Sequence, residues 1–200
     1  MKKISIATAV AFTLFTSHAF AQATNFTGLS GAVNLNVSTA NTEFSVSGAS
    51  LKLGEGSQSI GLQAAYGFSA GSNFVLNVGG TYGLGDLTLA KLVSGSSSVT
   101  IKGKNAYAIY LEPGYALSAS TLAYGKLAYL SMKAEISGAG TSGSKDFNGV
   151  GYGVGIRTML DKSLFLQAEF LQSDYETITD SGLSAKPTAT TGTVGIGYKF

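Results

Sequence analysis

Glycine recurs at every second position from 149 to 155, within the stretch GVGYGVGIR. A glycine-rich run binds phosphate when it forms the turn from a strand into a helix, because backbone N–H groups then point at the ligand. Here the intervening residues are Val150, Tyr152, Val154 and Ile156, all of them apolar. Alternation of two residue types over this length is typical of a β-strand. We therefore interpret the run as a strand with a glycine face and an apolar face, not as a nucleotide loop.

Charged residues on such weakly polar faces are candidates for ion pairs, because a charge buried without a partner is costly. Glu112 lies six residues before the short stretch SAS, and Lys126 lies six residues after it. Arg157 and Glu169 also flank the next short connection, at 159–163, one on each side. Opposite charges that face each other on neighbouring antiparallel strands can pair. We predict the pairs Glu112–Lys126 and Arg157–Glu169, joined by Lys199 near the end of the chain.

Groups that could carry out catalysis are scarce. The sole histidine is His18, and the chain has no cysteine. Asp174, Glu176 and Asp180 could form a carboxylate pair, but we interpret them as solvated surface charges. Isolated carboxylates without His or Cys neighbours do not specify a metal site. The sequence therefore predicts no enzyme, no metal and no cofactor.

The first residues predict an exported protein. Residues 1–21 combine a basic start, an apolar run over 4–15, and small residues at Ala19 and Ala21. These are the parts of a secretory signal peptide, and the apolar run is shorter than the roughly 20 residues of a membrane-spanning helix. We expect cleavage after Ala21, which leaves residues 22–200 as the mature chain, the part that forms the folded domain. An uncleaved membrane anchor is the alternative.

Removal of this leader changes the charge balance. The 13 Lys and Arg residues include Lys2 and Lys3, so the remaining 11 balance the 11 Asp and Glu residues. The basic excess of the full chain therefore does not indicate a nucleic-acid partner. A chain of this length would usually form one domain.

Alternation with a period of two recurs throughout the remaining chain, and it predicts eight β-strands. Short turns connect the strands at 69–73, 118–120 and 159–163, and longer polar stretches do so elsewhere. We interpret the longer stretches as surface loops. The expected strands cover residues 29–37, 60–68, 74–84, 107–117, 121–131, 149–158, 164–172 and 190–200, and the expected loops cover 38–58, 85–104, 133–148 and 173–188. The fold class is all-β, an eight-stranded antiparallel up-and-down barrel.

The composition of the two strand faces decides which one points outward. A soluble barrel, such as a lipocalin, would carry many charges on its exterior. Here the second face is mostly Gly, Ala, Ser, Thr and Asn, with an occasional charge. Such a lining fits the narrow interior of an eight-stranded barrel. The apolar face therefore faces lipid, and the sequence predicts a transmembrane β-barrel.

Aromatic spacing supports the membrane prediction. Phe74 and Tyr82 are eight residues apart on one face, and so are Tyr107 and Tyr115. At about 3.4 Å per residue and a tilt near 40°, eight residues rise roughly 21 Å along the membrane normal. This is close to the apolar band, about 25 Å tall, that aromatic girdles flank in outer-membrane barrels. We expect these four residues to belong to the two girdles.

The chain as a whole resembles the small eight-stranded outer-membrane barrels of Gram-negative bacteria, the OmpA/OmpX/Opa-like group. Its ending, TVGIGYKF, is similar to the signal that the barrel-assembly machinery of this family recognises, with Tyr198 and Phe200 as the matching residues. The resemblance implies that the short turns are periplasmic and the long loops extracellular. It also implies contact with outer-membrane lipids and lipopolysaccharide, and we expect a monomer.

Two hypotheses for function remain open, besides the enzyme already set aside. The first is a structural or surface-interaction protein whose loops contact host or cell-surface molecules, with the charged residues neutralising each other inside the barrel. The second is a narrow porin-like channel for ions or small solutes, in which the same charges form a gated polar pathway.

Overall fold

The computed structural model describes residues 22–46, 49–94, 97–138, 141–180 and 183–200. The expected signal peptide, residues 1–21, lies outside the described residues and stays a prediction. The described elements are η1 (Ala23–Phe26), β1 (Gly28–Val46), β2 (Ala49–Ser69), β3 (Phe74–Leu84), β4 (Leu87–Ser94), β5 (Ser97–Ala116), β6 (Thr121–Gly138), β7 (Thr141–Met159), β8 (Leu164–Tyr175), β9 (Ile178–Asp180) and β10 (Leu183–Lys199).

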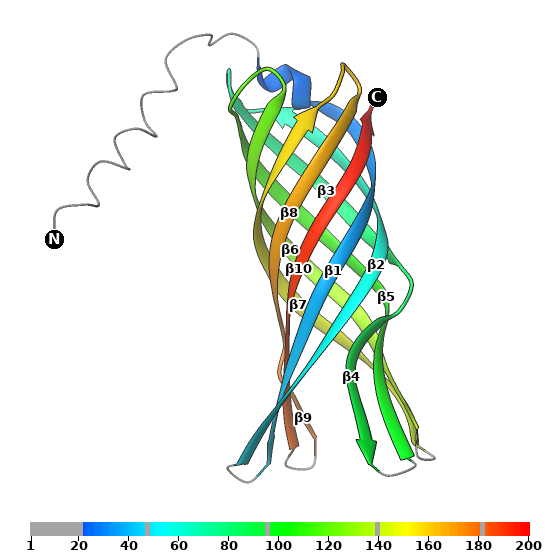
Figure 1. Ribbon diagram of the computed structural model, residues 1–200. Helices are drawn as coiled ribbons and strands as arrows, with labels where there is room; N and C mark the ends of the chain where they lie inside the picture. Colours follow the sequence, from blue (N-terminus) through cyan, green and yellow to red (C-terminus); the bar gives the residue numbers. More distant parts are fainter. Residues whose placement is uncertain (1–21, 47–48, 95–96, 139–140, 181–182) are drawn as a thin grey trace, which may run out of the picture.

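The strands form a closed antiparallel barrel (Figure 1). Neighbours in the chain are neighbours in the sheet, and β1 pairs with β10 from Ser30 opposite Lys199 to Val46 opposite Leu183. β3 and β4 both pair with β5, and β8 and β9 both pair with β10. We therefore count β3 with β4, and β8 with β9, as one interrupted barrel strand each. On this count the barrel has eight strands, and the predicted fold class is confirmed.

The three short turns lie where the sequence predicts them. β3, β6 and β8 begin at the predicted residues Phe74, Thr121 and Leu164. In the last turn, the Asp161 carboxylate accepts hydrogen bonds from the backbone N–H groups of Ser163 and Leu164, both at 2.7 Å. These hydrogen bonds fix the point at which β8 starts.

The prediction of long loops at the opposite end is wrong. The pairing of β1 with β2 continues without a break from Gly28 opposite Gly67 to Val46 opposite Ala49. The stretch expected as a loop over 38–58 is therefore mostly hairpin, and the other three polar stretches also contain paired strands. The alternation of apolar residues ends where the lipid-facing surface ends. Backbone hydrogen bonds between strands do not need this alternation, so the paired strands continue beyond it.

Beyond the barrel, the extended strands separate into two sheets, which we call the first arm and the second arm. Among the described strands, the first arm contains β9, β10, β1 and β2, and the second contains β4, β5, β6 and β7. Pairing between β2 and β3 ends with Ile60 opposite Leu84. The chain then bends at Gly85, whose φ of +114° favours glycine, and β4 continues along β5. Figure 1 shows the resulting hairpins projecting separately from one end of the barrel.

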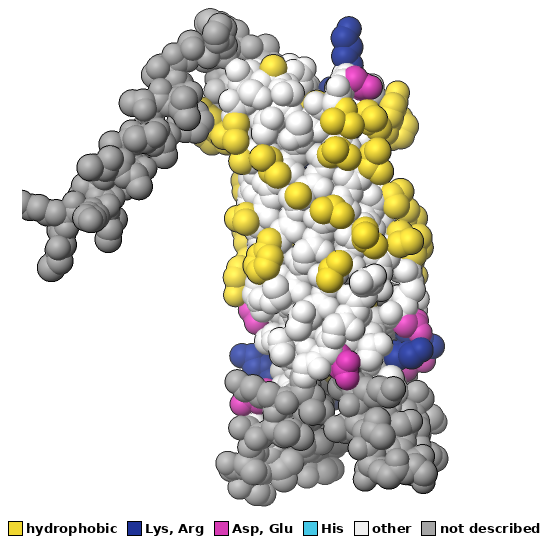
Figure 2. All heavy atoms as spheres, viewed as in Figure 1, with side chains coloured by type: hydrophobic (Ala, Val, Ile, Leu, Met, Phe, Trp, Pro, Cys, Tyr) yellow, Lys and Arg dark blue, Asp and Glu magenta, His cyan; other side chains and the backbone are white. Residues whose placement is uncertain are grey.

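The barrel has the inverse polarity of a soluble protein. Leu127 and Val154 on the outer face expose 62% and 65% of their surface, whereas the inward Glu112 is fully buried. In Figure 2, apolar side chains cover the upper and middle part of the barrel, and charged side chains lie at both ends of this band, most of them on the side of the arms. No helix within the described ranges is long and apolar enough to cross a membrane.

Candidate functional site

A belt of buried polar side chains crosses the barrel interior. It draws residues from β1, β2, β3, β5, β6, β7 and β8, and most of its members expose less than a tenth of their surface. This lumen belt consists of Asn34, Gln63, Asn77, Tyr110, Glu112, Tyr124, Lys126, Arg157, Gln167 and Glu169. Because alternate residues of each strand point inward, one or two polar residues per strand at similar heights build it.

Three ion pairs form the charged half of the lumen belt. Lys126 Nζ lies 3.1 Å from Glu112 Oε1 and 2.6 Å from Glu169 Oε2. Arg157 Nη2 lies 3.3 Å from Glu112 Oε2. The register explains the first contact, since Leu111 pairs with Leu127 and the adjacent positions 112 and 126 therefore face each other.

The expected pairing of Arg157 with Glu169 is not among the ion pairs of the described residues. In the register of β7 and β8, Arg157 lies opposite Gln167, and Glu169 lies opposite Gly155. Arg157 therefore donates to Gln167 Oε1 at 3.2 Å and reaches across the lumen to Glu112. Glu169 is bound by Lys126 instead.

Lys199 does not join the belt, contrary to the expectation. Its Nζ donates to the backbone carbonyl of Thr24 at 3.5 Å, at the rim where the chain termini lie. Position 199 lies opposite Ser30 in the register, several residues along β1 from the belt residue Asn34.

Amide side chains form the neutral half of the lumen belt. Gln167 Nε2 donates to Asn34 Oδ1 at 2.8 Å and to Gln63 Oε1 at 2.6 Å. Gln63 Nε2 donates to the Tyr110 hydroxyl at 2.7 Å. The sequence-based prediction did not include these amides. They are recognisable as the large polar side chains on the otherwise small-residue face of their strands.

The charges of the belt cancel, with two carboxylates against two cations. Aromatic rings add to their stabilisation: Lys126 Nζ lies 4.2 Å from the Tyr110 ring centroid, and Arg157 Cζ lies 4.8 Å from that of Phe165. Such contacts favour a cation in a desolvated setting. Arg157 Nε is buried and has no hydrogen-bond partner in the described part of the chain.

A second layer closes the lumen below the belt, at the end of the barrel where η1 lies. Ala23 and Phe26 of η1 are buried in one cluster with Val75, Leu122 and Tyr124. The Ala23 N–H donates to the Ser72 carbonyl at 3.1 Å, and the Asn25 amide donates to the Ala119 carbonyl at 2.8 Å. These bonds attach η1 to two different turns. The lumen is therefore sealed by an apolar plug as well as by the polar belt.

The expected girdle residues occupy two levels on the outer face. Phe74 lies directly opposite Tyr115, and Tyr82 lies directly opposite Tyr107, between β3 and β5. The rings of Phe74 and Tyr115 are 5.0 Å apart in an edge-to-face arrangement. Each of the four side chains exposes more than a third of its surface. The spacing of eight residues on both strands thus places two aromatic pairs at different levels of the outer face.

The predicted assembly-signal residues are also on the surface. Tyr198 and Phe200 expose 50% and 76% of their surface, with ring centroids 5.2 Å apart. Asp174 lies in β8, Glu176 between β8 and β9, and Asp180 at the end of β9. Among the residues that the structure describes, no group of three or more His, Cys, Asp or Glu side chains could hold a metal ion.

An apolar outer face, two aromatic levels and a sealed polar interior define a membrane β-barrel. The chain matches the outer membrane protein beta-barrel domain over residues 7–200. It belongs to this family, and so to the integral β-barrel proteins of the outer membrane of Gram-negative bacteria. Proteins of this kind contact membrane lipids and lipopolysaccharide.

Several solved structures are similar. Ail, the attachment invasion locus protein of Yersinia pestis, is 17% identical with a TM-score of 0.48, covering 85% of this chain and 99% of Ail. Neisserial surface protein A is 14% identical with a TM-score of 0.48, covering 84% of this chain and 99% of that one. OprG of Pseudomonas aeruginosa is 12% identical with a TM-score of 0.47, covering 87% and 97%. No curated protein sequence matches the chain.

Proposed function

We propose that this protein is a surface-interaction protein of the outer membrane, in which the barrel anchors the two arms and does not conduct. The observation that carries the proposal is the lumen belt, which fills the interior with paired charges and amides, above the plug formed by η1. The arms are then the part of the molecule available to partners, which we propose to be lipopolysaccharide and host or cell-surface molecules.

The reach of the first arm supports this role. The β1–β2 ladder beyond the last β2–β3 pair runs from Asn36 to Val46. At about 3.3 Å per residue, this length corresponds to roughly 35 Å along the strand. Unpaired strand edges along an arm are available to other polypeptides, because their backbone N–H and C=O groups have no partner strand. We also propose that residues 1–21 are removed on export, that Tyr198 and Phe200 guide assembly, and that the barrel is a monomer.

Shortening one arm tests the proposal. Ala40 and Glu55 are register partners, so residues 41–54 can be deleted and the strands rejoined by an Asn-Gly turn. Bacteria that display the shortened protein should lose adhesion to cultured host cells. The matched control places Asn-Gly at positions 47–48, which keeps the arm at full length, and it should adhere as the wild type does.

Conductance separates this proposal from the channel. In planar bilayers, the wild-type barrel should give no reproducible ion currents. Currents that appear in the wild type and change with Glu112→Gln would instead assign the lumen to ion passage, and adhesion unaffected by arm shortening would remove the surface role.

A further inference from the structure

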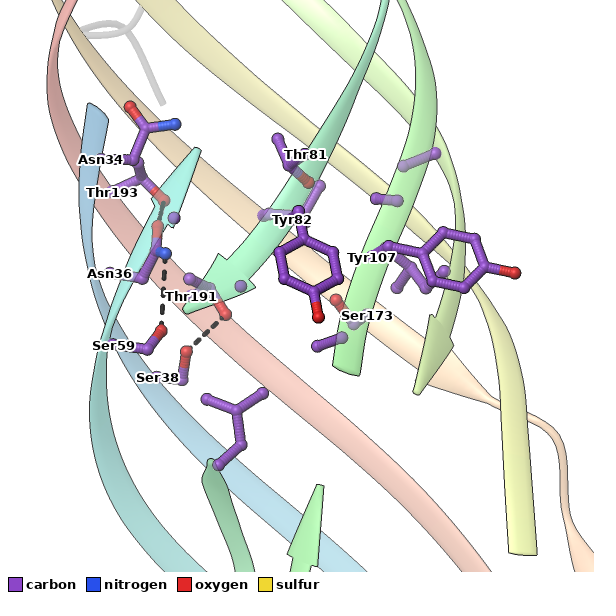
Figure 3. A pocket seen from close by; sticks show the side chains of 18 of the residues that line it. Asn34, Asn36, Ser38, Ser59, Thr81, Tyr82, Tyr107, Ser173, Thr191 and Thr193 are labelled. Atoms are coloured by element: carbon purple, nitrogen blue, oxygen red, sulfur yellow. Dashed lines mark hydrogen bonds between the residues drawn. The ribbon is translucent and has the colours of Figure 1, made fainter. Parts of the chain in front are cut away.

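A cavity of about 140 Å³ lies inside the barrel on the arm side of the lumen belt. Figure 3 shows its hydroxyl and amide side chains, which come mainly from β1, β2 and β10. Asn34, Tyr110, Lys126 and Glu169 of the belt also line it, so the belt forms its floor. We call this cavity the lumen cup. It is a blind pocket, because the belt and then η1 close the barrel beneath it.

The cup contains hydrogen-bonding groups that the protein does not use. Ser173 exposes only 4% of its surface and lines the cavity, yet its hydroxyl has no hydrogen-bond partner within the described ranges. Thr81, on the inward face of β3, is likewise without one in the described chain. Asn36 accepts from Thr193 at 2.8 Å, but its amide reaches Ser59 only at 3.5 Å. Polar groups that line a cavity without a partner in the protein can be paired by a ligand that supplies donors and acceptors.

The opposite wall of the cup is apolar. Ala108, Ala128, Leu130 and Leu171 line it from β5, β6 and β8. A ligand that fits both walls must carry several hydroxyl groups on one side and C–H groups on the other. Purely apolar molecules would leave the hydroxyl and amide groups unpaired.

The electrostatics of the cup exclude a charged ligand. Among the described residues that line it, the only Lys, Arg, Asp or Glu side chains are Lys126 and Glu169, which bind each other at 2.6 Å. A charged ligand would be desolvated with no free counter-charge to compensate. The volume is also restrictive: it holds about ten water-sized spheres, or a solute of similar size.

We propose that the lumen cup binds a neutral polyhydroxylated molecule of the size of one sugar ring. So few atoms support only weak binding, and a dissociation constant in the millimolar range is expected. The cup reaches into the base of the first arm, where Asn36, Ser38 and Ser59 line it, but deletion of residues 41–54 removes none of its lining residues.

The probe is D-glucose, added to ¹⁵N-labelled protein in nanodiscs free of sugar-headed detergent. Two ring-sized controls are D-glucuronate, which adds a charge, and cyclohexanol, which lacks all but one hydroxyl. Glucose should shift the amide resonances of Asn36, Ser59 and Ser173 saturably, and the controls should not. Thr81→Val and Ser173→Ala each remove an unused hydroxyl and should raise the dissociation constant about two- to tenfold.

Thr39→Val is the matched variant, because Thr39 is exposed on the outer face of β1. It should leave glucose binding unchanged. Three results would each overturn the proposal: no saturable shift with glucose, equal binding of glucuronate or cyclohexanol, or equal weakening by Thr39→Val and by the two cup variants.

Discussion

Replacing Glu112 by Gln is expected to destabilise the barrel, because it removes a buried charge that two cations share. Glu112 is fully buried and contacts Lys126 at 3.1 Å and Arg157 at 3.3 Å. Asn77 also donates to its carboxylate, at 3.5 Å. Gln keeps the shape of the side chain, so the variant removes the charge and leaves the packing intact.

The expected loss of unfolding free energy depends on the partners that each cation retains in the variant. Lys126 retains Glu169 at 2.6 Å, whereas Arg157 loses its only carboxylate among the described residues and keeps neutral contacts, with Gln167 and the Phe165 ring. Removing one member of a buried pair costs about 3–5 kcal/mol when the remaining charge is uncompensated. Since one of the two cations keeps a partner, we expect a loss near the lower end, about 3 kcal/mol.

Urea unfolding of lipid-reconstituted protein, followed by the difference in electrophoretic mobility between folded and unfolded barrels, measures this loss. Lys126→Met and the double variant complete a cycle, and coupling of about 0.5–3 kcal/mol is expected between directly interacting sites. The matched control is Glu135→Gln, because Glu135 binds Lys104 at 2.7 Å but on the surface. If Glu112→Gln destabilises no more than Glu135→Gln, or if the cycle is additive, the reasoning about the belt is refuted.

Three further predictions use the same unfolding assay. Phe26→Ala empties the plug of η1 and should cost about 3 kcal/mol, and an unchanged urea midpoint would contradict its role as a plug. Backbone N–H donors hold the pKa of the Asp161 carboxyl below its usual value, so its contribution is fully present above about pH 4 and is lost as the pH falls through the lowered pKa. The difference between wild type and Asp161→Asn should therefore shrink on acidification, and a constant difference would exclude this linkage. Gly155→Ala should impair folding, because its methyl group would collide with the Tyr124 ring, whereas Gly56→Ala meets open space and should fold normally; equal folding yields would contradict the collision.

The membrane-spanning part of the fold could be predicted because one physical signal specifies it. Apolar side chains must alternate wherever a strand has lipid on one side, so β3 is predicted at both ends, Phe74 and Leu84. Turn chemistry specifies the short connections, as at Asp161. Neither signal extends into the arms, where the outward face is polar and the apolar residues, such as Ala40, Leu89 and Met132, lie on the inward face. The sequence therefore predicts loops for the strands over 38–46 and 133–138.

The charge pairs show which contacts can be predicted from spacing along the chain and which cannot. Positions 112 and 126 face each other across a short hairpin, so their contact follows from the turn between them. Arg157 and Glu169 also flank a turn, but the register offsets them by two residues along β8. Contacts across the lumen, such as Arg157 with Glu112, depend on barrel closure and are not encoded in the spacing along the chain.

The strand register explains why glycines occur at particular positions on the lumen wall. Four of the large aromatic residues that point inward lie directly opposite a glycine on a neighbouring strand, in the pairs Tyr110–Gly79, Tyr124–Gly155, Phe165–Gly197 and Tyr175–Gly149. A Cβ atom at any of these glycines would meet the ring of its partner. A narrow barrel can hold aromatic side chains only if the opposite wall is small at the same height. The run from Gly149 to Gly155 therefore supplies the space that Tyr124 and Tyr175 fill, and it places Tyr124 where its hydroxyl donates to Glu169 of the belt at 3.2 Å.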